Sequence, residues 1–528
     1  MRKAVFFLLV FIGVLSTSCR KDFSFEPSQG NLKFSKQTVY LDTVFTNIGS
    51  STYRLKVYNQ SNSDISIPSI NLQKGASSKF RLMVDGRSGD GKSFKNVELL
   101  ANDSLYIFIE TTVDIASANP SDFLYTDKIE FHNTVSSPQT VDLVTLVQDA
   151  YFIYPQRTGA AGSYLYETIN LGLAPNNTPI QYIGSNLSRT DPVNGDELHL
   201  TNQKPYVIYG YAFVPNNENL VIDKGARVFF HANSGIIIPR NASFQINGTN
   251  PPTTAPQSFA NEVVFEGDRL EPQFSDVPGQ WGAIVNYSES STNVINHLTI
   301  KNATVGILTD QRLITDGYTP KLTINNSQIY NCSNIGILGR GAQINSQNVV
   351  INNCGEASLA GTYGGNYNFV HCTFNNNWNS SKQLAVFLSN FLETPSTIYL
   401  KNLSQANFTN CIIYGSNQVE MGFSKKDAAL FNPKFTNCLI KFNNISNALA
   451  TNPDYQFDTT PSRYQNVFIA QNNTNFNPKF INAAQNKLQL AQQWNAVAMP
   501  VAPGFIFNDI NGNSRTGTIA LGAYQYIP

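Results

Sequence analysis

The chain has 528 residues, which is long enough for about two to four domains. Charged residues make up 14% of it, and 36 Lys and Arg are balanced by 36 Asp and Glu, so the formal net charge is zero. This balance gives no electrostatic case for binding nucleic acid and no long-range attraction to anionic surfaces. The 35 Phe and 24 Tyr, together with few long charged helix formers, indicate a β-rich fold.

The first residues have the organisation of a secretory signal. Met1–Lys3 is positively charged, and Ala4–Leu15 is an apolar run of twelve residues. Such a run is too short to span a membrane and has the length of a signal-peptide core. Ser16–Ser18 are small residues, and Cys19 follows them. We therefore expect residues 1–18 to be a signal peptide.

This segment resembles the signal of bacterial lipoproteins, with Leu15 displaced by one place from the usual leucine position. The resemblance implies that Cys19 is the lipid attachment site and the first residue of the mature chain, acylated with palmitate-type chains. The alternative is an ordinary signal peptide followed by a chance cysteine. "RKDF" (20–23) resembles the charged export tag of surface lipoproteins in Bacteroidota-type bacteria, which implies an outer-membrane protein that faces the cell exterior.

Residues 19–30 read as a tether, and residues 31–148 read as an all-β domain. Short β-rich runs recur there at regular spacing, at 39–45, 53–58, 65–70, 80–84, 104–110, 128–131 and 140–146. Several of them alternate apolar and polar residues, which predicts an antiparallel β-sandwich. The order of "LKFSKQTVYLDTV", "YNQSNSDISI" and "LLANDSLYIFIETTVD" resembles the immunoglobulin-like (Ig-like) domains of bacterial surface proteins and of the Hydin-type family. The resemblance implies a spacer or an interaction module.

Beyond a connector and solenoid entry at 149–200, a cysteine motif recurs in the chain. An Ile or Phe lies three residues before each cysteine, and Asn or His lies directly before it. The five stretches are "IYNC" ending at Cys332, "INNC" at Cys354, "FVHC" at Cys372, "FTNC" at Cys411 and "FTNC" at Cys438. Related stretches end at Ala303 and Val467, and the successive intervals are 29, 22, 18, 39, 27 and 29 residues. An irregular period of about 20–30 residues predicts a solenoid.

The short extended runs of this region predict a right-handed parallel β-helix over residues 201–528. In this reading, equivalent positions stack along the axis, and the five cysteines form one ladder of small apolar side chains in the core. The asparagines mark turns, because Asn tolerates left-handed backbone and its amide can bond to the Asn one coil away. Disulfides are the competing reading in an exported protein. They are disfavoured because stacked rungs rarely reach disulfide geometry.

Two further segments resemble the right-handed β-helix lipoproteins of Bacteroidota-type bacteria. "GDRLE…PGQWG" (267–282) is the most specific part, and the final "FNDINGNSRTGTIALGAYQY" resembles the closing coils of bacterial β-helix surface proteins. The resemblance implies the fold and the surface location. It implies no particular reaction.

The best local constellation of charges is Glu266, Asp268, Glu271 and Asp276, with Arg269 among them and Trp281 after them. Its functional reading is a loop that binds calcium or sugar, and the alternative is a solvated connection whose charges pair with each other. The carboxylates between residues 321 and 450 are Glu356, Glu393, Glu420 and Asp427, and they do not recur in register on one face, so hydrolysis by two carboxylates is poorly supported. The five histidines are scattered and are expected to be structural; they are His132, His199, His231, His297 and His371.

The sequence therefore favours a non-catalytic interaction or scaffold protein, expected to need no cofactor. Its expected partners are an outer-membrane β-barrel or other surface lipoproteins, as in an accessory subunit of a complex for assembly or export of surface proteins. The alternative is a β-helix protein that binds or cleaves polysaccharide, by lyase or hydrolase chemistry. This alternative rests on analogy of fold.

Overall fold

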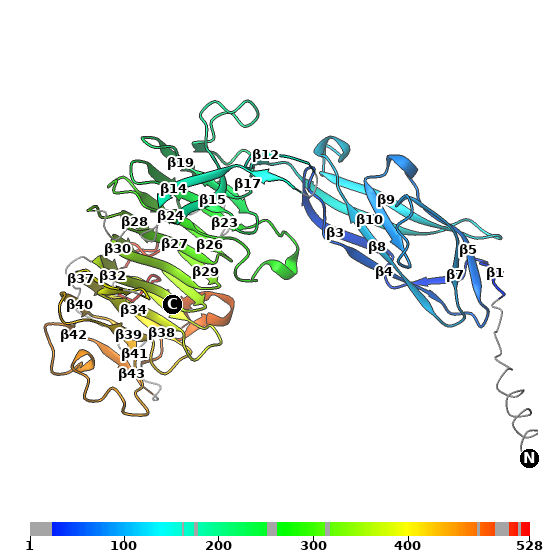
Figure 1. Ribbon diagram of the computed structural model, residues 1–528. Coiled ribbons are helices and arrows are strands. Elements are labelled where there is room, and N and C mark those ends of the chain that lie inside the picture. The colour runs from blue at the N-terminus through cyan, green and yellow to red at the C-terminus, as the bar shows by residue number, and fades with distance from the viewer. Residues whose placement is uncertain are drawn as a thin grey trace, which may run out of the picture. The chain divides into compact units, whose positions relative to one another are not determined.

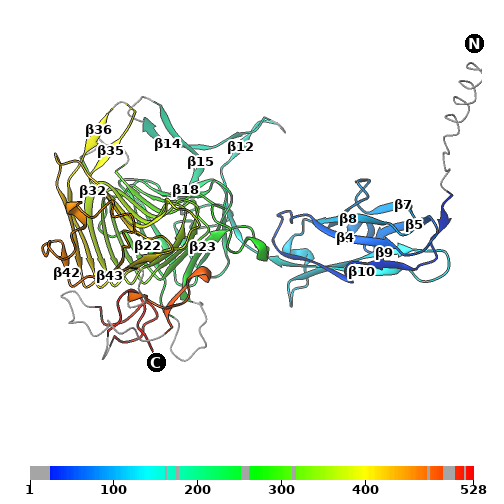
Figure 2. The ribbon, with the colours of Figure 1, turned by 90° about the horizontal axis from the view of Figure 1, so that it is seen from below.

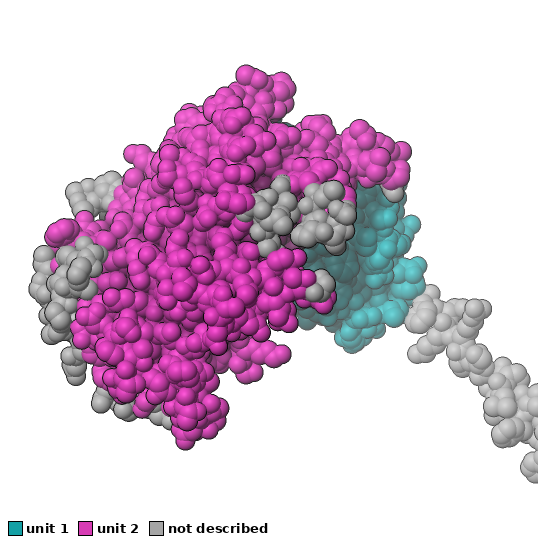
Figure 3. Space-filling model, turned by 60° about the vertical axis from the view of Figure 1, so that its left-hand side comes forward, with its two compact units in different colours: residues 1–149 teal, residues 150–528 magenta. Residues whose placement is uncertain are grey.

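The computed structural model describes residues 24–160, 163–173, 178–250, 261–311, 317–395, 397–471, 476–491, 506–515 and 519–527. The chain divides into two compact units, residues 1–149 and residues 150–528 (Figure 3). The secondary structure of the described residues is β-strand with short 3-10 turns and no α-helix. No helix in this part of the chain is long and apolar enough to cross a membrane.

Unit 1 contains two sheets with one apolar core between them (Figure 1). The four-stranded sheet is antiparallel and has the order β2 (Leu32–Phe34), β4 (Tyr53–Asn59), β8 (Ser104–Thr111), β6 (Phe80–Val84). The six-stranded sheet has the order β1 (Glu26–Pro27), β5 (Ile65–Leu72), β9 (Leu124–His132), β10 (Gln139–Gln148), β3 (Thr38–Phe45), with β7 (Ser93–Leu99) also paired to β5. Alternate residues of each strand enter the core, as Leu105, Ile107 and Ile109 do from β8.

The pairing in unit 1 differs from the expected antiparallel pattern at two places. The pairs β3–β10 and β1–β5 are parallel. The reason for the first pair is that β3 leads into β4, which lies in the other sheet, so β3 has no hairpin partner in its own sheet. It pairs instead with the last long strand of the unit.

Unit 2 is built on two long sheets whose pairings are parallel, apart from the antiparallel β14–β15 pair. The 11-stranded sheet contains β11 (Tyr151–Ile153), β17 (Tyr206–Ile208), β20 (Arg227–Phe230), β23 (Val263–Gly267), β26 (Leu298–Lys301), β29 (Gln328–Cys332), β31 (Val350–Cys354), β33 (Thr373–Asn376), β38 (Ile412–Gly415), β41 (Leu439–Lys441) and β43 (Phe468–Ala470). The sheet thus begins at Tyr151, within the segment expected to be the connector and solenoid entry.

The 18-stranded sheet receives the intervening strands of the chain. They are β14 (Thr168–Leu173), β15 (Pro179–Asn186), β16 (His199–Leu200), β18 (Tyr211–Phe213), β19 (Asn219–Asp223), β21 (Gly235–Ile238), β22 (Ser243–Asn247), β24 (Ile284–Asn286), β25 (Val294–Asn296), β27 (Val305–Asp310), β28 (Lys321–Asn325), β30 (Ile335–Gln347), β32 (Ala357–Val370), β34 (Leu384–Ser389), β37 (Leu403–Thr409), β39 (Met421–Ser424), β40 (Phe431–Thr436) and β42 (Tyr464–Gln465). A stretch that supplies one strand to the 11-stranded sheet and then crosses the 18-stranded sheet is called a coil below.

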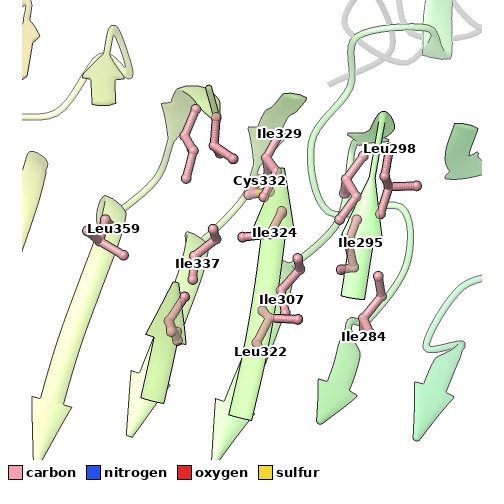
Figure 4. Packing of buried hydrophobic residues seen from close by; sticks show 14 of the residues in the cluster. Ile284, Ile295, Leu298, Ile307, Leu322, Ile324, Ile329, Cys332, Ile337 and Leu359 are labelled. Carbon is pink, nitrogen blue, oxygen red and sulfur yellow. The ribbon is translucent and has the colours of Figure 1, made fainter. Parts of the chain in front are cut away.

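The core of unit 2 consists of rows in which equivalent residues of successive coils lie in register. One row runs through the whole 11-stranded sheet, as Tyr151, Tyr206, Val228, Phe265, Ile300, Ile329, Ile351, Phe374, Ile413, Ile440 and Ile469. Figure 4 shows Ile295, Ile324 and Ile329 among the apolar side chains that fill this interior. Parallel stacking places like side chains next to each other, so each coil continues the packing of its neighbour.

The five cysteines lie in this core, but in two rows instead of the single expected ladder. Cys332 and Cys354 end β29 and β31 and are opposite each other in the 11-stranded sheet. Cys372, Cys411 and Cys438 follow β32, β37 and β40 of the other sheet, whose residues Phe369, Phe408 and Phe435 are in register. All five are fully buried and free of disulfides.

The physical reason for the two rows is that every coil turns at two corners with the same local chemistry. Asn331 and Asn353 at one corner, and His371, Asn410 and Asn437 at the other, all have left-handed backbone, with φ between 50° and 58°. Hydrogen bonds between side-chain amides join successive coils at both corners, as from Asn353 Nδ2 to Asn331 Oδ1 (2.8 Å) and from Asn437 Nδ2 to Asn410 Oδ1 (3.3 Å). The predicted turn role of the asparagines is therefore confirmed. The interval of 18 residues, from Cys354 to Cys372, leads from one corner of the coil to the other.

The described residues of the C-terminal segment do not form the expected closing coils. Its described strands β44 (Phe480–Asn482) and β45 (Lys487–Leu490) are an antiparallel pair outside both long sheets. Leu488, Ile510 and Tyr524 pack instead on the outward side chains Tyr330 and Val350 of the 11-stranded sheet. Figure 2 shows this segment (orange to red) beside the coils.

Polar contacts hold the C-terminal segment in this position. The buried Arg515 guanidinium donates to Asn348 Oδ1 (3.0 Å) and to the carbonyl oxygens of Ala520, Gly522 and Ala523. The Ala523 N–H donates to Thr373 Oγ1 (3.0 Å). An apolar outward face is therefore covered by the chain's own end.

Candidate functional site

The charged loop predicted at 266–276 does not bring its carboxylates together. Each acidic side chain has its own partner: Glu266 lies 3.6 Å from Lys301 Nζ, Asp268 2.7 Å from His231 Nδ1, Glu271 3.2 Å from Arg269, and Asp276 accepts from Asn331 Nδ2 at 3.3 Å. Among the described residues, no three His, Cys, Asp or Glu side chains form a group that could hold a metal ion. The acidic side chains of this loop therefore lie in separate pairs and do not form one cluster.

Trp281, which follows this loop, is part of the core. Its ring is 1% exposed and stacks on Phe230 with the ring centres 4.3 Å apart, and its Nε1 donates to the Lys301 carbonyl (2.8 Å). Such an indole cannot stack on a sugar. Trp378 is half-buried, and Trp494 lies outside the described residues, as Cys19 does.

His231 and Asp268 form the best-oriented pair of titratable side chains near this loop. Tyr209, His231 and Asp268 directly follow the neighbouring strands β17, β20 and β23, so parallel pairing places them in one row. The imidazole is about half exposed, stacks on Tyr209 with ring centres 4.4 Å apart, and bonds to Asp268 through Nδ1. An imidazole held by a carboxylate is an arrangement used in acid–base chemistry.

The electrostatics of this row favour a charged imidazole. The hydrogen bond to Asp268 raises the pKa of His231 above its usual value, and this effect exceeds the opposing effect of burial. Burial and the charge of Asp268 raise the pKa of Tyr209 to about 12. The phenol therefore stays protonated at neutral pH, and it cannot act as the second base of a catalytic pair.

The other histidines have structural surroundings. His132 lies 3.4 Å from Glu130, and His199 lies 2.9 Å from Asp223. His297 and His371 occupy coil corners, where burial lowers the pKa of His297 to about 4 and is the main cause of the lowered pKa, about 2, of His371. The predicted structural role fits both corner residues.

A second cluster, formed by Asp310, Arg340 and Lys401, was not identified from the sequence. Arg340 donates to Asp310 Oδ2 (2.8 Å) across β27 and β30, where the two residues are paired in register. Lys401 Nζ donates to the Gly341 carbonyl (3.0 Å) and to Gln311. The sequence could have predicted the pairing of Asp310 with Arg340, because the repeated stretches "VGILTD" (305–310) and "IGILGR" (335–340) place these two residues at equivalent positions. Lys401 comes from a hairpin outside the repeat, so no coil alignment predicts it.

Two antiparallel hairpins leave the parallel coils and expose large apolar side chains. One is β12 (Arg157–Thr158) with β13 (Leu165–Tyr166), and the other is β35 (Phe391–Glu393) with β36 (Ile398–Leu400). Leu165 is 73% exposed and Ile398 is 45% exposed. Figure 2 shows β12 and the β35–β36 hairpin on the same side of unit 2. Each hairpin carries two large exposed apolar side chains, Leu165 and Tyr166 on the first and Ile398 and Leu400 on the second.

No protein-family model matches the chain, and no curated protein matches it. Among solved structures, a family 123 glycoside hydrolase from Clostridium perfringens is similar at 9% identity over 23% of this chain and 30% of that chain, with a TM-score of 0.16. The chain thus spans less than a third of that hydrolase.

Two further solved structures are similar over about a quarter of the chain. The ASH/PapD-like domain 7 of human CEP192 has 14% identity over 24% of this chain and 92% of that chain, with a TM-score of 0.16. A protein of unknown function from Porphyromonas gingivalis W83 has 15% identity over 27% of this chain and 62% of that chain, with the same TM-score of 0.16. At these TM-scores the likenesses support no conclusion about fold or function.

Proposed function

We propose that the chain is a lipid-anchored, non-catalytic interaction protein of the outer membrane that faces the cell exterior. In this proposal it is an accessory subunit of an outer-membrane protein complex, with a β-barrel or another surface lipoprotein as its partner. Cys19 carries the lipid, residues 19–30 are the tether, and the two units that follow present binding surface.

The proposal includes a finer description of both units. Unit 1 is an Ig-like sandwich, and its support is the single core enclosed by two sheets. Most of unit 2 is a parallel β-helix, and its support is the alternation of successive strands between two long parallel sheets. The helix is right-handed, in keeping with the general hand of parallel crossover connections.

The observation that carries the proposed function is the pair of hairpins with exposed apolar side chains. Each hairpin is a two-stranded sheet, so each of its strands has only one neighbouring strand in the described part of the chain. Exposed apolar side chains beside free strand edges are features that protein partners cover, by apolar contact and by strand addition. Two such hairpins on one side of unit 2 give a partner two points of attachment.

Recovery of the tagged full chain from native membranes in mild detergent tests this function. We expect a barrel protein or a surface lipoprotein to be recovered with it in a fixed ratio. The double variant Leu165→Asp with Ile398→Asp should lose that partner, because it places a carboxylate at each attachment point. The control Val193→Asp changes a residue that is 85% exposed in another turn, and it should retain the partner. Recovery of the wild-type chain alone, or equal recovery by the double variant, would contradict the proposal.

The second candidate function is binding or cleavage of polysaccharide, and the row of Tyr209, His231 and Asp268 favours it. A screen of acidic and neutral glycans for released unsaturated or reducing ends tests cleavage. His231→Gln should abolish any such activity. His199→Gln is a matched control, because His199 is equally exposed and is also paired with an aspartate (Asp223, 2.9 Å). Activity that survives His231→Gln would show that this row is not its source.

A further inference from the structure

The outward face of the four-stranded sheet in unit 1 combines aromatic rings with positive charge. Tyr106 and Phe108 of β8 are 38% and 37% exposed, and their rings lie 6.2 Å apart at an angle of 20°. Cross-strand pairing places Lys56 opposite Tyr106 and Arg54 opposite Phe108. Lys56 Nζ lies 5.3 Å from the centre of the Tyr106 ring. The result is a pair of partly exposed, nearly parallel rings, an aromatic platform flanked by cations.

The charges on this face are unbalanced. Four basic side chains point outward from its strands, Lys33, Arg54, Lys56 and Arg81, against the single acidic side chain Glu110. Glu110 pairs with Arg81 at 3.7 Å. The zero net charge of the whole chain conceals this local excess of positive charge.

The opposite outward face of unit 1 provides an internal comparison. On the six-stranded sheet, Lys128 pairs with Asp142 at 3.3 Å, and His132 pairs with Glu130 at 3.4 Å. Charges of both signs therefore occur as pairs on that face. The four-stranded sheet, in contrast, combines an excess of basic side chains with two neighbouring exposed rings.

We propose that the outward face of the four-stranded sheet binds an acidic polysaccharide whose rings lie on Tyr106 and Phe108. A sugar ring offers a flat apolar C–H surface to an aromatic platform, and its carboxylate reaches the flanking cations. Lys and Arg suit that role, because charge-assisted hydrogen bonds to carboxylates are strong and Arg can make two of them. A protein partner is a poorer fit, since the cores of protein interfaces are depleted in Lys and this face presents Lys33 and Lys56.

This site is separate from the hairpins of unit 2, so its test is independent of the proposed protein partner. Isothermal titration of the full chain in mild detergent uses polygalacturonate as the acidic probe. Its fully methyl-esterified form is the neutral polymer with the same backbone, and phosphatidylglycerol vesicles, compared with phosphatidylcholine vesicles after removal of the detergent, are the anionic surface without sugar. We expect binding to polygalacturonate that weakens with salt, and no binding to the ester.

Two double variants separate the contribution of the aromatic rings to binding from that of the neighbouring positive charges. Arg54→Gln with Lys56→Gln, and Tyr106→Ala with Phe108→Ala, should each weaken binding at least about tenfold, because each removes one half of the recognition. The control Lys128→Gln removes one charge from the opposite face and should change affinity by less than about twofold. Thermal unfolding of each variant checks that unit 1 remains folded.

Four results would overturn the proposal. They are absence of binding to polygalacturonate, equal binding of the methyl ester, an equal loss of affinity in Lys128→Gln, and binding to the anionic vesicles alone. The last result would identify a membrane surface, and not a glycan, as the ligand of this face.

Discussion

Unit 1 encloses its core between two sheets, whereas unit 2 stacks its core in rows along parallel strands. In unit 1, core neighbours come from distant parts of the chain, as Phe34 and Phe131 do with ring centres 4.6 Å apart. In unit 2, Phe408 lies between its equivalents of the adjacent coils, 5.0 Å from Phe369 and 4.8 Å from Phe435. A residue of unit 2 therefore depends on the coils before and after it, and a residue of unit 1 depends on the facing sheet.

The largest expected effect tests whether the two cores are independent. Phe408→Ala should cost about 3–5 kcal/mol of the free energy of unfolding of unit 2, because it leaves a cavity inside a row of rings. Phe131→Ala should cost unit 1 a similar amount, about 3–5 kcal/mol. The hydrophobic cores of the two units share no residue. Each substitution should therefore shift only the unfolding transition of its own unit, in denaturant unfolding followed by fluorescence and circular dichroism. A shift of both transitions by either variant would show that the two units unfold as one.

Glu420 gives a sharper test of unit 2, because it is a carboxyl group buried at a corner of the coils. Its Oε1 accepts from the Asn417 N–H (2.7 Å), and its buried Oε2 has no hydrogen-bond partner. Burial raises the pKa of Glu420 from 4.5 to about 9. The carboxyl group is then protonated in the folded chain at neutral pH and ionised in the unfolded chain.

The sign of the pH dependence follows from this difference in proton binding. Between pH 4.5 and about 9 the folded state holds a proton that the unfolded state has released, so stability falls as pH rises through this window. Glu420→Gln should leave stability unchanged below pH 4.5 and raise it at pH 8, by about 1–3 kcal/mol. Denaturant titrations at both pH values measure the effect, with the exposed Glu356→Gln as the control. A loss of stability at pH 8 would show that the ionised carboxylate is favoured in the fold.

The difference between the two units also explains how much of each fold can be predicted from the sequence. The seven β-rich runs expected in residues 31–148 all occur as strands, since alternation is a local property that a single run reveals. Strand β7 was missed because "SFKNVEL" (93–99) contains few β-branched or aromatic residues. The parallel pairing of β3 with β10 could not be predicted, because it depends on which sheet each strand joins.

In unit 2 the repeat predicts the chemistry of a corner but not which corner of the coil it occupies. "INNC" and "FVHC" look equivalent, and yet Cys354 ends a strand of one sheet while Cys372 follows a strand of the other. The packing of the C-terminal segment on Tyr330 and Val350 was also unpredictable, because that contact joins residues more than 130 positions apart. The pairing of His231 with Asp268 depends on register in the same way, across the 36 residues between them.

The smallest expected effect concerns the two cysteine rows. Cys438→Ala removes one sulfur atom from a fully buried site and should cost unit 2 about 1 kcal/mol, without changing the transition of unit 1. Cys438 Sγ donates a weak hydrogen bond to the Phe408 carbonyl oxygen at 3.3 Å, and the substitution also removes this bond. A far more disruptive change at the same site is Cys438→Asp, which buries a carboxyl group in the row and should prevent unit 2 from folding.

Thiol-reactive reagents test both cysteine rows directly. In the native protein all five cysteines should stay unlabelled, because each is fully buried. After unfolding without reductant all five should react, because none is in a disulfide. Labelling in the native state at Cys332 and Cys354 alone would mean that the corner after the 11-stranded sheet opens while the other stays closed, so the two rows would differ in stability. Thiols that stay blocked after unfolding until reductant is added would be disulfide-bonded. That result would contradict the two rows of free cysteines.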